Sequence, residues 1–323
     1  MTDNNQSAED YSATSTDTLK ASGLLAGLGA TIPLVAAPMA GGPSTPALVL
    51  AAAQAGGLGL LAVGYKAPEQ LAAQIAEVRA GVAAFGVNLF GVNLFAPNPV
   101  PIDKDAFVEY TEALRELAAT YNLSLDEVDA LEDDDEWEAK VDMLVNDPVP
   151  VVSFTFGLPP AETVRRLQKA GSLVFQTVTN PDEGEQASAM GVDGLVVQSY
   201  KAGGHSGTLA PGTPVEQIPL ADLLDRVRSR VHVPIWAAGG ISTPAGVRDA
   251  LAHRAEAAVV GSVLLRSSES GASKPYRAAL ADTHRTETVV TTAFSGRPAR
   301  AFAMPSWIGS TVSPQVATLP STT

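Results

Sequence analysis

The four histidines are the first candidates for acid–base chemistry in this sequence, because imidazole is the side chain whose unperturbed pKa lies near neutrality. His232 precedes an apolar run, His253 lies near the end of a helical pattern and His284 lies in a polar segment, so we expect all three at the surface. His205 differs, because it follows an apolar run and lies between glycines in the segment Gln198 to Gly207. Glycine lets the backbone approach a flat ligand closely and adopt positive φ angles. The pattern predicts an active-site base at His205, with an ordinary flexible surface loop as the alternative.

Small residues at two later apolar runs form a second candidate site. One run ends at the pair Gly239 and Gly240, and the next contains Gly261 and Ser262. Small residues let an anion approach unpaired backbone N–H groups, and the last two strand-to-helix loops of an α/β barrel often bind phosphate in this way. Each motif alone would also suit a tight turn after a strand. Together the two motifs predict a site for a phosphorylated cofactor.

These residues must be positioned by an alternation of short apolar runs and helical patterns. Runs that suit buried parallel strands occur at residues 33–38, 58–63, within 85–95, 149–156, 173–180, 194–199, 233–239 and 257–265. Helical patterns occupy residues 44–55, 67–80, 105–121, 160–170, 182–190, 215–230 and 243–253. The alternation indicates the α/β class and predicts a (β/α)8 TIM barrel, which places catalytic residues at the carboxyl ends of its strands. A doubly wound open sheet is the alternative, but no G-x-G-x-x-G follows the first run.

Two segments interrupt this alternation. The run FGVNLFGVNLF at residues 85–95 repeats five residues in tandem, and a strand can use only one copy in register. We expect the other copy to extend the strand or its following loop. Residues 126–147 are strongly acidic, with Lys140 as the one base, but they lack the glycine and spacing of a calcium loop. We therefore expect a solvated acidic helical insertion after the third strand, and no metal site.

The composition excludes several classes of protein. The chain has 323 residues, of which 46% are hydrophobic, so it can bury a large core. Its 21 basic and 35 acidic residues give a net charge of -14, which argues against nucleic-acid and membrane-surface partners. The absence of cysteine excludes disulfides, thiolate metal sites and a cysteine nucleophile.

We expect three parts along the chain: a disordered tail at 1–22, a barrel at 23–300 that includes the insertion 103–147, and a C-terminal extension at 301–323. The polar tail contains neither a basic n-region nor an apolar h-region, so a cytoplasmic location is predicted. The most apolar stretch, 47–63, is short for a bilayer span and is interrupted by glycines. A homo-oligomer is left open.

Seven motifs follow one another in a defined order along the alternation. They are Ala37 to Gly42 with Ser44 to Pro46, Ala55 to Gly59, the FGVNLF run, Val152 to Gly157, Ala202 to His205, Ala237 to Ile241, and Thr292 to Arg300. In this order, and from Pro33 to about Arg300, the chain resembles the FMN-dependent nitronate monooxygenases, formerly called 2-nitropropane dioxygenases.

The resemblance implies a barrel that holds FMN non-covalently at its carboxyl-end mouth. His205 would face the nitro group of the substrate as base or donor. The implied cofactor-binding residues are Met39, Asn88 or Asn93 (one from each tandem copy), Gln198, Gly203 and Gly204 around the ring, and Gly239, Gly240, Gly261 and Ser262 at the phosphate. Ser295 and Arg297 could approach the site, but we expect Arg297 to form a salt bridge that closes the barrel.

The implied activity is the oxidation of alkyl nitronates by O2 to a carbonyl compound and nitrite, without NAD(P)H. Neutral nitroalkanes would also be substrates if His205 removed their α-proton. The alternatives are an FMN-dependent enoyl-thioester reductase that uses NAD(P)H, and a catalytically silent flavin-binding protein. Ser199, Lys201 and Val259 depart from the residues that the family usually carries, so the identity of the substrate is less constrained than that of the cofactor.

Overall fold

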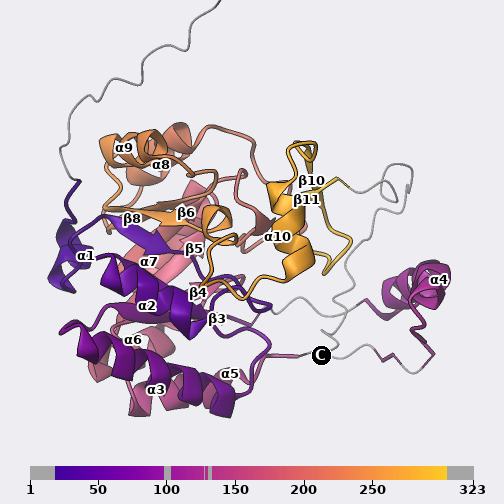
Figure 1. Ribbon diagram of the computed structural model, residues 1–323, viewed down its shortest axis with the longest axis horizontal. Helices are drawn as coiled ribbons and strands as arrows, with labels where there is room; N and C mark the ends of the chain where they lie inside the picture. Colours follow the sequence, from indigo (N-terminus) through magenta and orange to yellow (C-terminus); the bar gives the residue numbers. More distant parts are fainter. Residues whose placement is uncertain (1–18, 98–102, 127, 130–132, 304–323) are drawn as a thin grey trace, which may run out of the picture.

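Eight parallel strands close into a barrel in the computed structural model (Figure 1), which describes residues 19–97, 103–126, 128–129 and 133–303. The strands are β1 (Leu34–Ala36), β2 (Leu58–Ala62), β3 (Phe90–Phe95), β4 (Val151–Thr155), β5 (Leu173–Val178), β6 (Gly194–Gln198), β8 (Ile235–Ala238) and β9 (Ala257–Val260). The sheet closes on itself because the first strand, β1, pairs both with β2 and with the last barrel strand, β9. Val35 lies opposite Leu58 in the first pairing and opposite Val259 in the second. The predicted barrel is confirmed, and the open sheet is excluded.

One helix follows most strands and covers the outside of the barrel. These helices are α2 (Pro46–Gln54), α3 (Pro68–Ala84), α6 (Ala161–Ala170), α7 (Pro181–Ala189), α8 (Leu220–Arg228) and α9 (Pro244–Ala252). Three of them start from the same local signal, in which a polar side chain caps the helix and proline takes the first helical position. Thr45, Asn180 and Thr243 each accept a hydrogen bond from a backbone N–H of the first turn. The helix starts are therefore encoded locally.

The tandem repeat contributes its second copy to the barrel. Strand β3 begins at Phe90 and pairs with β2 and β4, whereas Asn88 is exposed in the connection that precedes the strand. The expectation that the other copy extends the strand or its following loop is therefore wrong. If the first copy formed the strand, α3 would have to unwind its last turn and expose the buried Val82. The second copy leaves this turn intact.

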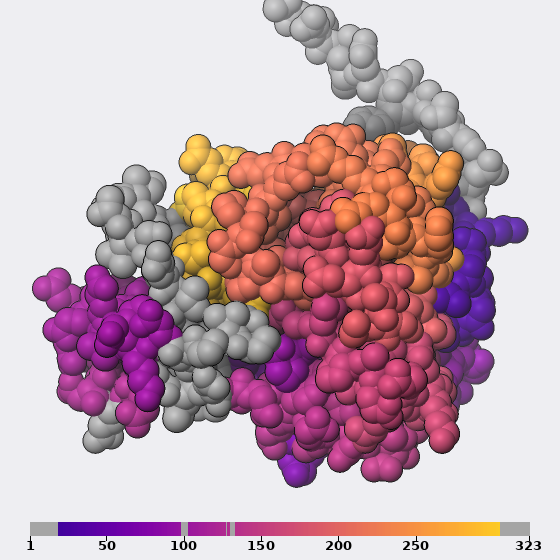
Figure 2. Space-filling view, turned by 180° about the vertical axis from the view of Figure 1, so that it is seen from behind, coloured from indigo at the N-terminus to yellow at the C-terminus, as the bar shows by residue number. Residues whose placement is uncertain are grey.

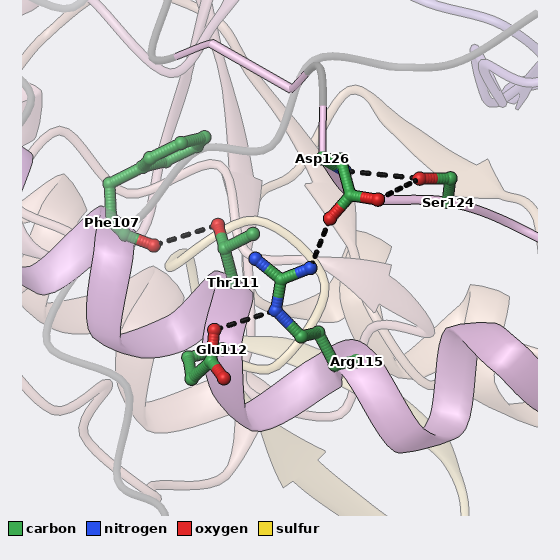
Figure 3. Close-up of polar contacts among 6 residues, drawn as sticks. All are labelled: Phe107, Thr111, Glu112, Arg115, Ser124 and Asp126. Carbon is green, nitrogen blue, oxygen red and sulfur yellow. Dashed lines mark hydrogen bonds and ion pairs between the residues drawn. The ribbon is translucent and has the colours of Figure 1, made fainter.

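The acidic insertion consists of two dissimilar helices. Helix α4 (Lys104–Thr120) stands apart from the barrel in both views (Figures 1 and 2) and has a small apolar cluster of its own around Phe107 and Tyr110. Its surface carries exposed polar contacts, among them the bonds from Arg115 to Glu112 and Asp126 (Figure 3). This part is solvated, as the sequence predicts.

The second helix of the insertion belongs to the core, which corrects the expectation of a wholly solvated segment. Helix α5 (Trp137–Asn146) buries Trp137, Val141 and Leu144 against the barrel. The side chain of Lys140 is 1% exposed and forms an ion pair with Asp135 at 2.7 Å. The segment is mostly acidic, but its apolar residues recur at helical spacing and form one apolar face of the helix. Within the residues that the structure describes, no cluster of histidine, aspartate or glutamate is suited to a metal ion.

A second, three-stranded antiparallel sheet lies beside the barrel and was not predicted. Strand β11 (Ala299–Phe302) is central in it, between β10 (Thr288–Thr291) and β7 (Gly204–His205). It runs two residues past the predicted end of the barrel unit at 300. Further short elements are α1 (Gly23–Gly27), the 3-10 turn η1 (Ser262–Leu264) and α10 (Lys274–Ala281). The tail residues 1–18 and residues 304–323 of the predicted extension lie outside the described residues.

A search of the described helices found none with the length and apolar character needed to span a membrane.

Candidate active site

The carboxyl ends of the barrel strands bring most of the predicted site residues to one edge. Met39 follows β1, and the segment Gln198 to His205 ends and follows β6. Gly239 and Gly240 follow β8, and Gly261 and Ser262 follow β9. Because all eight strands are parallel, these ends meet at the same mouth. Asn88 precedes its strand and therefore lies toward the opposite end of the barrel. Of the two asparagines that the sequence left open, the fold retains Asn93.

Three glycines, Gly203, Gly239 and Gly240, pack so closely against neighbouring segments that a Cβ would collide, whereas a Cβ at Gly261 would lie 3.3 Å from Ala37 Cβ. We call these four residues the glycine cluster. A Cβ at Gly203 would lie 2.6 Å from Ser262 Oγ, so the loops after β6 and β9 touch there. A Cβ at Gly239 would lie 2.7 Å from the Oγ of Ser199. Gly239 and Gly240 also have φ angles of 99° and 76°, which favour glycine.

The glycine cluster leaves backbone donors available to a ligand. Gly240 and Ser262 are exposed, and their N–H groups donate no hydrogen bond to the part of the chain that the structure describes. The stem of Lys201 packs on Gly240, because a Cβ at that glycine would lie 2.9 Å from Lys201 Cβ. Met39 borders the same cluster, since a Cβ at Gly261 would lie 3.6 Å from its sulfur. Unpaired donors beside a cation are suited to an anionic group such as phosphate.

His205 is held from both its backbone and its ring. It lies in β7 and pairs with Ala299 of β11, while its Nε2 lies 2.7 Å from Ser295 Oγ. The loop then crosses the barrel mouth, because a Cβ at Gly207 would lie 2.6 Å from Thr177 Cγ2 at the end of β5. The histidine therefore lies at the mouth, where the sequence predicts it.

The electrostatic surroundings keep the His205 imidazole neutral. Burial lowers the pKa of His205, and the nearby positive charge of Arg297 lowers this pKa further. The Phe156 ring meets the imidazole edge-on at a centroid distance of 6.2 Å and contributes to the apolar environment. A neutral imidazole can accept a proton at neutral pH, as a general base must.

Gln198 and Asn93 lie at the site, but both amide atoms of Gln198 and the amide nitrogen of Asn93 already have partners. Gln198 accepts a hydrogen bond from the Gly207 N–H at 2.7 Å and donates to the His205 carbonyl at 3.3 Å. It therefore braces the histidine loop. The Asn93 amide donates to Ser153 Oγ at 2.9 Å and to Thr155 Oγ1 at 3.0 Å, inside the barrel. The direct contacts of these two residues with a flavin stay predictions.

Arg297 does not form the salt bridge that the sequence suggested. It is 8% exposed, and no ion pair in the described part of the chain includes it. Its guanidinium lies over the Phe156 ring at 4.7 Å from the ring centroid, and Nη1 donates to the Thr208 carbonyl at 3.3 Å. The residue that was expected to be structural is a buried cation next to the candidate base.

The sequence reasoning missed the aromatic side chains at the mouth and the anchor of the histidine loop. One aromatic residue stands at or after the end of each of β2, β3 and β4: Tyr65, Phe95 and Phe156. The ring centroid of Phe95 lies 5.4 Å from that of Tyr65 and 4.7 Å from that of Phe156. The buried Glu183 accepts hydrogen bonds from Thr208 Oγ1 at 2.6 Å and from the Leu209 N–H at 2.9 Å. The aromatic residues could have been found from the sequence, because one of them lies near the end of each of three successive predicted strands. No pattern in the sequence indicates the role of Glu183.

A cavity of about 450 Å³ adjoins the site behind the histidine loop. Gln198 and Gly204 line it from the barrel side, and residues 211–215, Gln217 and the small sheet line the remainder. The three other histidines lie elsewhere: His232 and His284 are exposed, and His253 ends α9 next to Asp225. They are not brought to the mouth.

Comparison with known proteins matches this architecture to one family. The family model of nitronate monooxygenase matches residues 23–323. A protein named probable nitronate monooxygenase from Bacillus subtilis (strain 168) is 32% identical over 273 residues, which cover 84% of this chain and 76% of the relative. A protein of the same name from Staphylococcus aureus (strain MSSA476) is also 32% identical, with coverage of 83% and 74%.

Two solved structures share the fold over most of this chain. The nitroalkane oxidase from Streptomyces ansochromogenes has a TM-score of 0.77 and 41% identity, covering 84% of this chain and 76% of its own. FabK from Thermotoga maritima has a TM-score of 0.65 and 26% identity, covering 86% of this chain and 73% of its own.

Proposed function

This chain belongs to the nitronate monooxygenase family of flavin-dependent oxidoreductases, and on that premise we propose that it oxidises alkyl nitronates with O2 to a carbonyl compound and nitrite. The observation that carries the proposal is the position of His205, a neutral imidazole anchored at the barrel mouth. It lies at the same mouth as the glycine cluster, so the proposed base and the proposed phosphate site would lie together.

We propose FMN as the cofactor, because the residues at the mouth fit it. Gly239, Gly240, Gly261 and Ser262 would hold the phosphate, with the unpaired N–H groups of Gly240 and Ser262 as the supporting observation. Met39, Asn93, Gln198, Gly203 and Gly204 would border the ring. When bound, FMN would supply the electron acceptor for the nitronate, while the protein supplies orientation, electrostatics and access.

His205 has a distinct task for each protonation state of the substrate. A nitronate has already lost its α-proton, so His205 would only orient its nitro group. A neutral nitroalkane must lose this proton, and the imidazole can accept it, because one ring nitrogen is anchored by Ser295 and the other is left for the substrate. A positioned general base contributes about 10²- to 10⁴-fold to such a step.

The direct test is the reaction itself. Oxygen consumption and nitrite release with propyl nitronate should occur without NADH, in a purified protein that is yellow. If the protein oxidises NAD(P)H in the presence of an enoyl thioester but does not oxidise nitronate, the proposal is overturned in favour of the reductase. A yellow protein that consumes no oxygen, whichever nitronate is added, would favour the silent flavin-binding protein.

The cofactor site has its own test at Gly261. Its backbone angles, φ -120° and ψ -78°, do not demand glycine, and a Cβ there would meet Ala37 Cβ at 3.3 Å. Gly261→Ala should therefore retain flavin, whereas Gly261→Asp should lose it, because its carboxylate would repel the phosphate. Flavin absorbance per protein, measured after gel filtration, reports the result. Gly27→Asp, at an exposed glycine of α1, is the control; a fully flavinated Gly261→Asp would contradict the phosphate assignment.

We further propose that residues 23–300, including the insertion 103–147, form the FMN-binding unit. The cytoplasmic location and the oligomeric state stay predictions of the sequence.

A further inference from the structure

Arg297 is a buried charge without an internal counter-ion among the described residues. Exposed arginines such as Arg230 pair with carboxylates, whereas the partners of the Arg297 side chain are a carbonyl and an aromatic face. A buried, unpaired charge costs several kcal/mol, unless hydrogen bonds or an opposite charge offset the lost hydration. One neutral hydrogen bond and one cation–π contact offset only part of this cost.

The guanidinium nevertheless remains charged at neutral pH. Burial lowers the pKa of Arg297 to about 10, which still lies well above neutrality. The site therefore contains a permanent cation, partly stripped of water, whose field is stronger than that of an exposed arginine.

This cation belongs to the same site as His205. Both side chains contact Phe156, the guanidinium across its face and the imidazole edge-on. The backbone N–H of Arg297 also donates to Ser295 Oγ at 3.4 Å, the hydroxyl that anchors the His205 ring. Two residues of one turn thus place the cation and the base around one aromatic ring.

We propose that Arg297 is the residue that recognises the anionic form of the substrate, binding the nitro oxygens of the nitronate and making the site prefer a nitronate to the neutral nitroalkane. This inference rests on the proposed function. A nitronate carries its charge on two oxygens in one plane, and the planar fork of a guanidinium matches two such oxygens. The neutral nitroalkane lacks the net charge and gains less from the contact.

Kinetics with both substrate forms test the inference. In Arg297→Gln the KM for propyl nitronate should rise by about 10- to 100-fold, the loss expected for a charged hydrogen bond. The KM for neutral nitropropane should change by less than about threefold, and Arg297→Lys should recover part of the nitronate affinity. Arg228→Gln is the matched control, because Arg228 also donates to backbone carbonyls, those of Val233 and Arg254, which precede β8 and β9 at the opposite end of the barrel.

A binding measurement separates this inference from the proposed function. Nitrate is a planar oxyanion that resembles the nitronate head group and requires no turnover. Isothermal titration calorimetry should show nitrate binding to the wild-type protein and to Arg228→Gln, but not to Arg297→Gln. If the wild type oxidises no nitronate, the proposed function fails, and this titration still tests the anion site. If the wild type oxidises nitronate while Arg297→Gln keeps both its KM and its nitrate affinity, the inference is wrong and the function stands.

Should Arg297→Gln not fold, Arg297→Lys decides the question alone. A KM for nitronate and a nitrate affinity both equal to those of the wild type would overturn the inference, because lysine cannot reproduce the planar fork. A rise in the KM for nitronate with an unchanged KM for nitropropane would support it.

Discussion

His205 is the side chain on which the proposed proton transfer depends. Replacing it with asparagine keeps a polar group of similar size but removes the basic nitrogen. We expect His205→Asn to retain its flavin and to lose about 10²- to 10⁴-fold in kcat/KM with neutral nitroalkanes, with a much smaller loss for nitronates, which need no deprotonation. Nitrite release from the two substrate forms measures both effects. His253→Asn, at the end of α9, is the control, and unchanged turnover of nitroalkane in His205→Asn would remove its assigned role.

The pH dependence follows from the same residue. Burial and the charge of Arg297 hold the pKa of His205 below its ordinary value of 6.5, so the neutral, active form persists into mildly acidic solution. The acid limb of kcat/KM for nitroalkane should therefore lie below pH 6.5. Removing the positive charge in Arg297→Gln should raise the pKa of His205 and move this limb to higher pH, whereas Arg297→Lys should leave it nearly in place. A limb that moves to lower pH in Arg297→Gln would contradict the electrostatic assignment.

Single residues also show where sequence reasoning stops. His205 could be predicted because glycines framed it after an apolar run, a local pattern. The surroundings of Arg297 could not be predicted, because they consist of Phe156 and Thr208, which are distant in sequence. An arginine near a chain segment that closes a fold usually pairs with a carboxylate, and only the packed structure shows that this one does not.

Among the elements, the connection between α3 and β3 has the clearest consequence for stability. The first tandem copy forms this connection, and Leu89 within it is buried. Deleting residues 86–90 would leave a complete FGVNLF strand but would join it directly to the end of α3, so the helix must unwind its last turn. We expect a loss of several degrees in Tm by thermal unfolding, at about 2–4 °C per kcal/mol for a chain of this size class. Asn88→Ala should leave Tm unchanged, and an equally stable deletion variant would show that the first copy is dispensable.

The barrel strands and most helices could be predicted because each is encoded locally, by a continuous apolar run or by a cap followed by proline. Helix α5 was missed because its apolar residues Trp137, Val141 and Leu144 alternate with acids that dominate the composition of the segment. The small sheet was missed because β7 is only two residues long and exists through its pairing with Ala299 and Arg300. A pairing between segments so far apart leaves no periodicity in either one.

For the whole molecule, the net charge of -14 opposes the approach of an anionic substrate. The cation of Arg297 is buried, so salt screens its local attraction much less than it screens the long-range repulsion from the surface. Raising the ionic strength from low to physiological values should therefore increase kcat/KM for nitronate, by about two- to threefold. The same measurement with neutral nitropropane is the control and should show no change. A decrease with salt for nitronate would indicate that attraction at the mouth outweighs the repulsion of the surface.

The pairing of β7 with β11 also bears on how the enzyme is made. During translation all eight barrel strands leave the ribosome before Ala299, the residue that fixes the backbone of His205. The backbone of His205 thus gains its partner in β11 only after every strand of the barrel has been made. A chain cut short before Ala299 would accordingly contain all eight barrel strands but lack the strand that pairs with His205.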